Sequence, residues 1–365
     1  MTKHLEEFRR LCAHDPSARP PRWESLGFWE QTVERWHNEG LPEHQSPEEY
    51  FEMHPRAYLP GSSGFTGLPL YPEFDKEILE EDINTVTYRG GNGIVLRELK
   101  VHSELSMPQW LEFPVKNRAD WDLFKERLDI RTRPLPTKEE IEREVDFRYP
   151  VAFTFCGFYG APRNLFGEEN LSYAYYDQPD LIHDIQRYWL EYCKENIRRI
   201  AGSVRIDYVL FWEDMSYKTA PLISPATFRE FMSPYYRELV DYVRRLGIEQ
   251  IMVDSDGNND LLMELFLDTG VNMMMPFEIA ADQCPLRMRE LYGDRLVIVG
   301  GIDKRAVAQG REAIRAEVLG TVPELLRRGG YIPCIDHSCP PDVSFDNWRY
   351  FVDRVRDCVE RQVGG

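Results

Sequence analysis

The chain has 365 residues, of which 42% are hydrophobic, and its formal net charge is −18. This composition is typical of a globular protein, and no apolar run is long enough to cross a bilayer. The acidic excess argues against nucleic-acid binding, because phosphate contacts need clustered Lys and Arg. The charged residues 1–12 lack the apolar segment of a secretory signal, so we expect a cytoplasmic protein.

Short sequence motifs exclude several other classes of site. The seven cysteines are scattered and form no CxxC pair, which argues against a disulfide framework and a structural zinc knuckle. Neither GxGxxG nor GxxxxGK[ST] occurs, so the sequence predicts no dinucleotide-binding loop and no P-loop.

Residues 1–75 are rich in aromatic residues and prolines and show little periodicity. The pattern predicts one helix at about residues 27–39, and residues 58–69 have the composition of a loop. Disordered tails are poor in aromatic residues, so we interpret residues 1–75 as a capping extension that packs on the rest of the chain.

Residues 76–365 are predicted to form one domain, which opens with a β-hairpin. Strands at residues 85–88 and 94–99 flank the glycine-rich turn of residues 90–93. A helix is expected at about residues 119–128.

From residue 149 onward the chain alternates between short apolar strands and amphipathic helices. Strands are expected at residues 151–156, 207–212, 250–253, 272–275, 296–299 and 331–335, and helices at 181–200, 225–246, 261–267, 285–291, 313–328 and 345–362. The strands are apolar on both faces, as buried parallel strands are. Six such units plus two strands from the earlier half predict a (β/α)8 TIM barrel, with a doubly wound open sheet as the alternative.

Each of the six expected strands runs into polar or glycine-rich residues. In a parallel barrel, functional side chains lie at these carboxyl ends. Candidates for substrate binding are Tyr159, Arg163, Asn258 and Glu278, each of which follows one of these strands.

The strand at residues 250–253 ends in Asp254-Ser255-Asp256-Gly257, which sends two carboxylates the same way if the extended conformation persists. Solvated turn acids are the simpler interpretation. His337 is the only histidine at an expected strand end in the alternating half. Asp254, Asp256 and His337 together suit zinc or another divalent metal, and Asp256 and His337 equally suit metal-free proton transfer.

Glu213 and Asp214 follow the strand at residues 207–212, and only one of them can face the mouth of a barrel. Glu213 shares parity with Val209 and Phe211, so we expect Glu213 to be the catalytic residue of the two. Cys334 lies inside an expected strand and Cys339 precedes Pro340, which makes thiolate ligation the less favoured alternative.

Several stretches resemble the uroporphyrinogen decarboxylase superfamily, from about Phe28 onward. They are FPVKNRADWDLFKERLD, WEDMSYKTAPLISPATFREFMSPYYREL, DSDGN, GGIDKR and GGYIPCIDHSCPPDVSFDNWRYF. The resemblance implies a (β/α)8 barrel, in agreement with the alternation. Decarboxylases of this superfamily act on uroporphyrinogen without a cofactor and carry an arginine-rich motif of the type RQAGRY, which has no counterpart here.

The other branch contains methyltransferases that exchange methyl groups between corrinoid proteins and thiols or other acceptors. They hold zinc with His-x-Cys-Gly and a later cysteine. Alignment on Gly257 places Asp254 at the histidine and Asp256 at the first cysteine, and alignment on Pro340 places His337 at the later cysteine. His337 also falls where the decarboxylases carry a histidine.

The resemblance therefore implies first a corrinoid-linked methyltransferase that acts on a small molecule, with the corrinoid supplied by a partner protein or as free cobamide. The alternatives are a decarboxylase whose carboxylate substrate is held by arginines such as Arg163, and a non-catalytic cobamide or tetrapyrrole binder. Relatives in the family also imply a homodimer.

Overall fold

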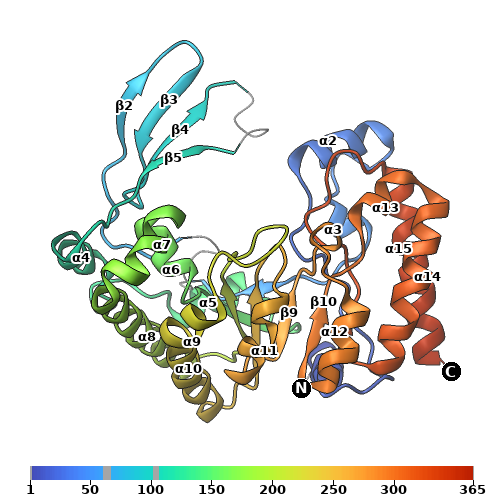
Figure 1. Ribbon diagram of the computed structural model, residues 1–365. Helices are drawn as coiled ribbons and strands as arrows, with labels where there is room; N and C mark the ends of the chain where they lie inside the picture. The colour runs from blue at the N-terminus through green and yellow to red at the C-terminus, as the bar shows by residue number, and fades with distance from the viewer. Residues whose placement is uncertain (1, 61–66, 102–106, 365) are drawn as a thin grey trace.

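The computed structural model describes residues 2–60, 67–101 and 107–364. Its centre is a curled sheet of seven parallel strands in the order β1-β6-β7-β8-β9-β10-β11, surrounded by helices (Figure 1). The strands are β1(Ala57–Tyr58), β6(Val151–Cys156), β7(Tyr208–Trp212), β8(Gln250–Asp254), β9(Met273–Met275), β10(Val297–Val299) and β11(Tyr331–Ile332). The six strands expected after residue 149 are all present. Most of the loop expected at residues 58–69 lies outside the described residues.

The expected helices of the second half are present, except that two helices, α9 and α10, replace the single helix expected at residues 225–246. They are α8(Pro179–Ala201), α9(Pro225–Phe231), α10(Ser233–Arg245), α11(Asp260–Asp268), α12(Pro285–Tyr292), α14(Arg311–Arg328) and α15(Phe345–Gly364). The sequence pattern missed the shorter α6(Gly160–Phe166), α7(Glu168–Asp177) and α13(Lys304–Gln309). The first half contains α1(Lys3–Cys12), α2(Glu30–Glu39), α3(Pro47–Tyr50), α4(Arg118–Lys125) and α5(Lys138–Glu144).

Of the two barrel strands expected from the earlier half, the described part of the sheet contains one, β1, and the predicted hairpin lies outside this sheet. A separate antiparallel sheet consists of β2(Glu77–Glu81), β3(Thr85–Arg89), β4(Val95–Leu99) and β5(Gln109–Glu112), and it projects from the molecule (Figure 1). A tight turn joins only antiparallel neighbours, whereas parallel strands need a long crossover. The hairpin itself was predicted, but its strands cannot enter a parallel sheet.

The parallel sheet is barrel-like, but its described part has seven strands and not eight. Residues 22–28 run between the two end strands β1 and β11. The N–H of His54 donates to the carbonyl of Arg22 (2.9 Å), and Ser25 Oγ donates to the carbonyl of Ile335 (3.1 Å). This segment of the amino-terminal region therefore occupies the place of the missing strand.

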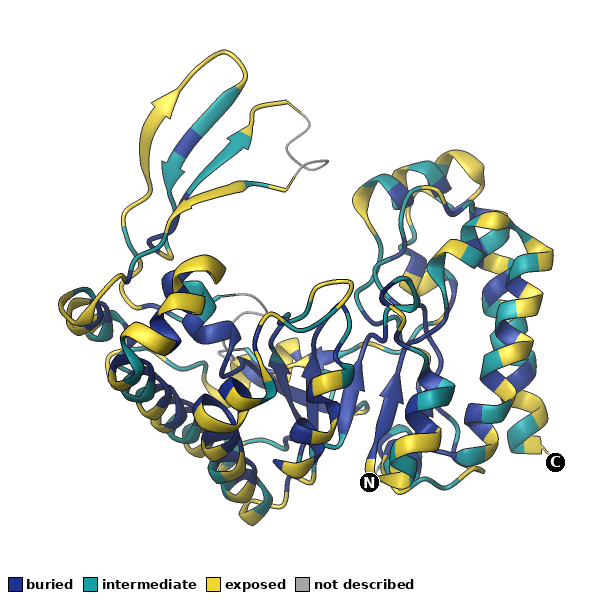
Figure 2. Ribbon diagram, viewed as in Figure 1, coloured by how far each residue is buried: buried dark blue, intermediate teal, exposed yellow. Residues whose placement is uncertain are grey.

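Alternate residues of each strand point to opposite sides of the curled sheet. One set, which includes Tyr208, fills its interior and packs with α1 and Trp23. The other set, which includes Phe155 and Phe211, packs against the surrounding helices. The strands are accordingly buried on both faces (Figure 2).

Most aromatic residues of the amino-terminal region pack on the flank or the base of this sheet. Trp36 of α2 lies 5.6 Å, centroid to centroid, from Trp348 of α15, and its indole donates to the carbonyl of Val343 (2.8 Å). Trp23 lies 5.7 Å from Phe8 of α1. No helix in the described ranges has both the length and the apolar character that a membrane crossing requires.

Candidate active site at the carboxyl ends of the strands

Asp254 is the last residue of β8, and its side chain is on the interior face together with that of Met252. Only 4% of Asp254 is exposed, and its Oδ1 has no hydrogen-bond partner among the described residues. Burial raises the pKa of this carboxyl well above its usual range, and the neighbouring charge of Asp256 raises it further. Its surroundings therefore disfavour the charged form of Asp254.

Asp256 and His337 meet at the mouth of the sheet. Asp256 Oδ2 lies 3.2 Å from His337 Nε2, and about a quarter to a third of each side chain is exposed. The other carboxylate oxygen, Oδ1 of Asp256, is buried and has no partner in the part of the chain that the structure describes. The predicted proximity of these two residues is thus present as a direct contact.

The three residues supply donor types that suit a divalent metal, since carboxylates and imidazole bind zinc, iron and manganese. However, no group of three His, Cys, Asp or Glu side chains within residues 2–60, 67–101 and 107–364 is close enough to hold one ion. Asp254, Asp256 and His337 as arranged here do not fit a three-ligand metal site. Asp256 and His337 fit a hydrogen-bonded acid–base pair, with the buried Asp254 carboxyl nearby.

Glu213 lies on the helix side of the sheet, away from the mouth. Its carboxylate accepts the N–H groups of Phe158, Tyr159 and Gly160 at 2.7–2.9 Å and the hydroxyl of Tyr236. Burial raises its pKa to about 7, against the effect of these hydrogen bonds. Glu213 therefore fixes the start of α6 and is fully enclosed.

The alternation along β7 was predicted correctly, but the residues on the helix side were taken for those on the interior side. Val209 and Phe211 point to the helices, while Leu210 is on the interior face. Glu213 continues the outward set. Asp214, which sequence reasoning set aside, turns with a positive φ of 42° and influences the pKa of Asp254 through its charge. Asp214 is therefore the acidic residue of this pair that belongs to the mouth.

Arg163 reaches Asp214 from α6. Its Nη1 donates to the carbonyl and the carboxylate of Asp214 (2.7 and 2.8 Å), and its Nη2 lies 2.7 Å from Glu168. The guanidinium also lies over the ring of Trp212, 5.3 Å from its centroid. Tyr159 is buried, and burial raises the pKa of its hydroxyl. Arg163 is thus neutralised by two carboxylates.

Asn258 and Glu278 stabilise the loops that follow β8 and β9. The Asn258 amide donates to the carbonyl of Ala281 (2.9 Å), and Glu278 Oε2 accepts the N–H of Gly257 (3.0 Å). Glu278 Oε1 also lies 3.5 Å from Lys304 Nζ. Both side chains hold the loop that carries Asp256.

Sequence reasoning missed Arg56, which precedes β1. Its guanidinium donates to the carbonyl of Ser25 and lies over the rings of Trp23 and Tyr58, at 5.8 and 5.5 Å. Within the described residues no carboxylate is within ion-pair distance, although its charge acts on the pKa of Asp254. The sequence signal for this contact is the two-residue spacing between Arg56 and Tyr58, which puts both side chains on one face of a strand. That signal can be used only once residues 57–58 are known to be a strand.

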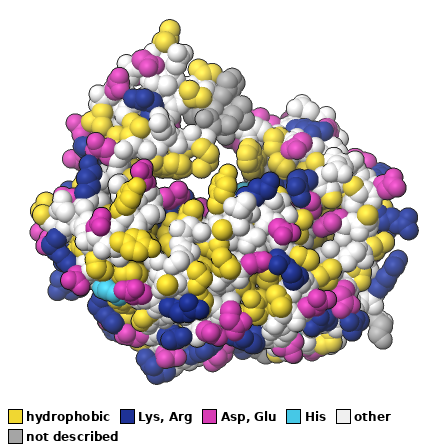
Figure 3. All heavy atoms as spheres, in the orientation of Figure 1, with side chains coloured by type: hydrophobic (Ala, Val, Ile, Leu, Met, Phe, Trp, Pro, Cys, Tyr) yellow, Lys and Arg dark blue, Asp and Glu magenta, His cyan; other side chains and the backbone are white. Residues whose placement is uncertain are grey.

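The surface is hollowed beneath the projecting sheet of β2–β5, and hydrophobic side chains border this hollow (Figure 3). Exposed apolar residues of that sheet include Ile78 and Trp110. The hollow gives the molecule a wide concave face.

Comparison with known proteins places the chain. The family model described as Uroporphyrinogen decarboxylase (URO-D) matches residues 103–358, which is more than half of the chain. Two relatives named uroporphyrinogen decarboxylase are similar to it. The one from Gloeobacter violaceus is 24% identical over 271 residues, covering 65% of this chain and 74% of the relative. The one from Syntrophotalea carbinolica is 25% identical over 273 residues, covering 69% and 71%.

Among solved structures, the chain resembles a methyltransferase from Methanosarcina mazei. The TM-score is 0.58 at 14% identity, and the match covers 98% of this chain and 99% of that one. This similarity concerns the fold. Together with the family match, it shows that the chain is a divergent member of the uroporphyrinogen decarboxylase family.

Proposed function

We propose that this protein is a methyltransferase that exchanges a methyl group between a corrinoid and a small-molecule acceptor. The observation that carries this proposal is the group formed by Asp254, Asp256 and His337, in which a buried carboxyl with a raised pKa lies near a carboxylate–imidazole pair. The likeness over nearly the whole chain to a fold found in a methyltransferase supports it.

His337 is the proposed proton-transfer group. An ionised Asp256 can only accept a hydrogen bond, so the 3.2 Å contact places the imidazole proton on Nε2. Nδ1 is then the free acceptor, and no described residue donates to it. In methyl transfer this nitrogen takes the proton of an acceptor X–H, or returns one when X is the leaving group.

Asp254 has a different role in this scheme. Because burial favours the neutral form of its carboxyl, Asp254 in this scheme donates a hydrogen bond and repels an electron-rich acceptor less than an ionised carboxylate would. Its unpartnered Oδ1 supplies the free acceptor that an incoming X–H or water needs for orientation. Two acids at the end of β8 thus serve opposite purposes in this scheme.

Charge at the mouth disfavours a polyanionic tetrapyrrole as the substrate. The carboxylates of Asp214 and Asp256 lie there, while Arg163 is already held by Asp214 and Glu168. A substrate with many carboxylates needs an excess of cations, since like charges repel. The residues that the structure brings together favour a neutral or cationic acceptor.

The test is methyl transfer with purified protein and methylcobalamin, with thiols, phenols and amines as acceptors. We expect demethylation of methylcobalamin, monitored through its absorption spectrum. This activity must be lost in His337→Gln. Elemental analysis of the same protein tests the divalent metal that the resemblance implies. Absence of transfer to every acceptor, with free methylcobalamin and with an added corrinoid protein, contradicts the proposal.

Decarboxylation is the second candidate, because the relatives named above are uroporphyrinogen decarboxylases. Incubation with uroporphyrinogen at high enzyme concentration discriminates between the two, since released CO₂ supports this candidate and unchanged substrate excludes it. A cobamide that binds without turnover in either assay would identify a binding protein. Gel filtration with light scattering tests the expected homodimer.

A further inference from the structure

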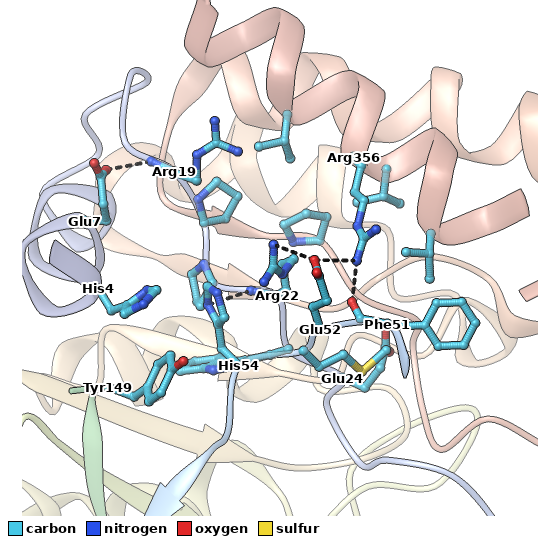
Figure 4. Close-up of a pocket in the computed structure, with 18 of the residues that line it drawn as sticks. His4, Glu7, Arg19, Arg22, Glu24, Phe51, Glu52, His54, Tyr149 and Arg356 are labelled. Carbon is cyan, nitrogen blue, oxygen red and sulfur yellow. Dashed lines mark hydrogen bonds and ion pairs between the residues drawn. The ribbon is translucent and has the colours of Figure 1, made fainter. Parts of the chain in front are cut away.

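A second cavity lies at the other end of the sheet, away from Asp254. It has a volume of about 510 Å³ and is lined by α1, by the chain on both sides of α2 and α3, and by α15 (Figure 4). Tyr149, which directly precedes β6, forms part of its wall. Cavities of this size commonly hold small ligands.

Two arginines in this cavity share one carboxylate. Arg22 Nη1 and Arg356 Nη2 lie 4.0 and 3.9 Å from Glu52 Oε2, and both distances exceed hydrogen-bond length. The Arg22 side chain donates no hydrogen bond to any described residue, and Arg356 donates to the carbonyl of Phe51. The two guanidinium charges therefore have donor capacity to spare.

Besides Glu52, three carboxyl groups line the cavity, and one of them, Glu7, is already paired with Arg10 at 3.2 Å. Arg19 is already held by Glu360, at 2.5 and 2.9 Å. Burial raises the pKa of Glu24 well above its usual range, which disfavours a negative charge on this carboxyl. Arg22 and Arg356 thus carry one positive charge more than Glu52 balances.

One wall of the cavity, beside Arg22 and Arg356, consists of aromatic and imidazole rings. His4 and Tyr149 stack at 4.5 Å, and His54 meets His4 edge to face at 4.6 Å. The pKa of His54 is lowered to about 4 by burial and next by the charge of Arg22, so this imidazole is neutral. Met53 and Phe351 add apolar surface.

We propose that this cavity binds a small organic anion, whose carboxylate or phosphate lies between Arg22 and Arg356 and whose ring lies against His4, His54 and Tyr149. Arginine holds such groups through paired N–H donors. The ligand displaces Glu52, whose side chain is 72% exposed and free to turn into solvent. The site is independent of the proposed methyl transfer.

Calorimetric titration of the full chain tests this site with phenyl phosphate, benzoate and inorganic phosphate as probes. We expect saturable binding of phenyl phosphate or benzoate with a dissociation constant below about 1 mM, and the preferred one identifies the anion as phosphate or carboxylate. Inorganic phosphate, which lacks a ring, binds more weakly. If neither ring-bearing probe saturates, the proposal is wrong.

Three variants locate the site. Arg22→Gln weakens binding about tenfold, because one charge-assisted contact is lost. Glu52→Gln strengthens binding several-fold, since the internal competitor is removed. Arg19→Gln, in the same cavity but already paired, leaves affinity unchanged within about twofold. Equal losses in Arg19→Gln and Arg22→Gln, or weaker binding in Glu52→Gln, overturn the proposal. Arg22 and Glu52 are partly exposed, so both variants fold.

Discussion

Asp256 Oδ2 and His337 Nε2 are 3.2 Å apart although 81 positions separate the residues in the chain. The first follows β8 and the second follows β11, so the curvature of the parallel sheet joins them. His337→Gln and Asp256→Asn are each expected to lower kcat of methyl transfer about 100-fold or more, the usual contribution of a positioned acid–base group.

The control for this pair is His44→Gln, because His44 is exposed and is distant in the sequence from both Asp256 and His337. Single-turnover rates at matched protein concentration make the comparison. Full activity in both His337→Gln and Asp256→Asn would exclude the assignment.

A second prediction concerns the pH dependence of stability through Glu213. Burial raises its pKa from 4.5 to about 7, so the folded state binds the proton more tightly than the unfolded chain does. The contribution of Glu213 to stability is therefore fully present below pH 4.5 and is lost as the pH rises through 7. The shift corresponds to about 3 kcal/mol.

Urea denaturation at several pH values between 4.5 and 8 measures this slope. Glu213→Gln should flatten it and should also lower stability at all pH values by about 1–3 kcal/mol, because an amide nitrogen cannot accept the N–H groups of α6. An unchanged slope in Glu213→Gln would show that other buried acids, such as Asp336, dominate.

A third prediction concerns Gly257, which has a φ of +74°. A Cβ at this position would lie 2.4 Å from the carbonyl oxygen of Ser216, which is backbone and cannot turn aside. Gly257→Ala should therefore displace the loop of Asp256, lower stability by about 1–3 kcal/mol and reduce activity. Gly202→Ala is the matched control, since nothing lies within 4 Å of its Cβ. Thermal unfolding and methyl-transfer rates are the measurements.

The sequence predicted the second half of the fold well because its strands and helices obey local rules. Each parallel strand, such as residues 151–156, is a short apolar run, and the crossover helices are amphipathic. The site was predicted only where it depends on strand ends, as for Asp254. The direction of the Glu213 side chain was predicted wrongly, because which face of a strand is interior depends on what packs against that face.

The amino-terminal half resisted prediction for a physical reason. β1 has only two residues, and it is a strand because β6 lies beside it. Arg56, which has no periodic context, acquires its role from Trp23, Ser25 and Tyr58 after folding. Non-local contacts of this kind leave no pattern in the sequence.

The last prediction follows from Arg56. Its guanidinium links residues 22–28 to the start of β1 through the carbonyl of Ser25 and the ring of Trp23. Arg56→Gln removes this link and leaves Trp23 without its cation, so we expect a loss of about 2–3 kcal/mol in the free energy of unfolding. Arg349→Gln, in an exposed pair with Asp346, should cost less than about 0.5 kcal/mol. The charge of Arg56 also lowers the pKa of Asp254, so the same variant should raise that pKa. The basic limb of the activity profile should then shift to higher pH. Denaturation curves and a pH–rate profile measured together distinguish this dual role from simple packing, which would leave the profile unmoved.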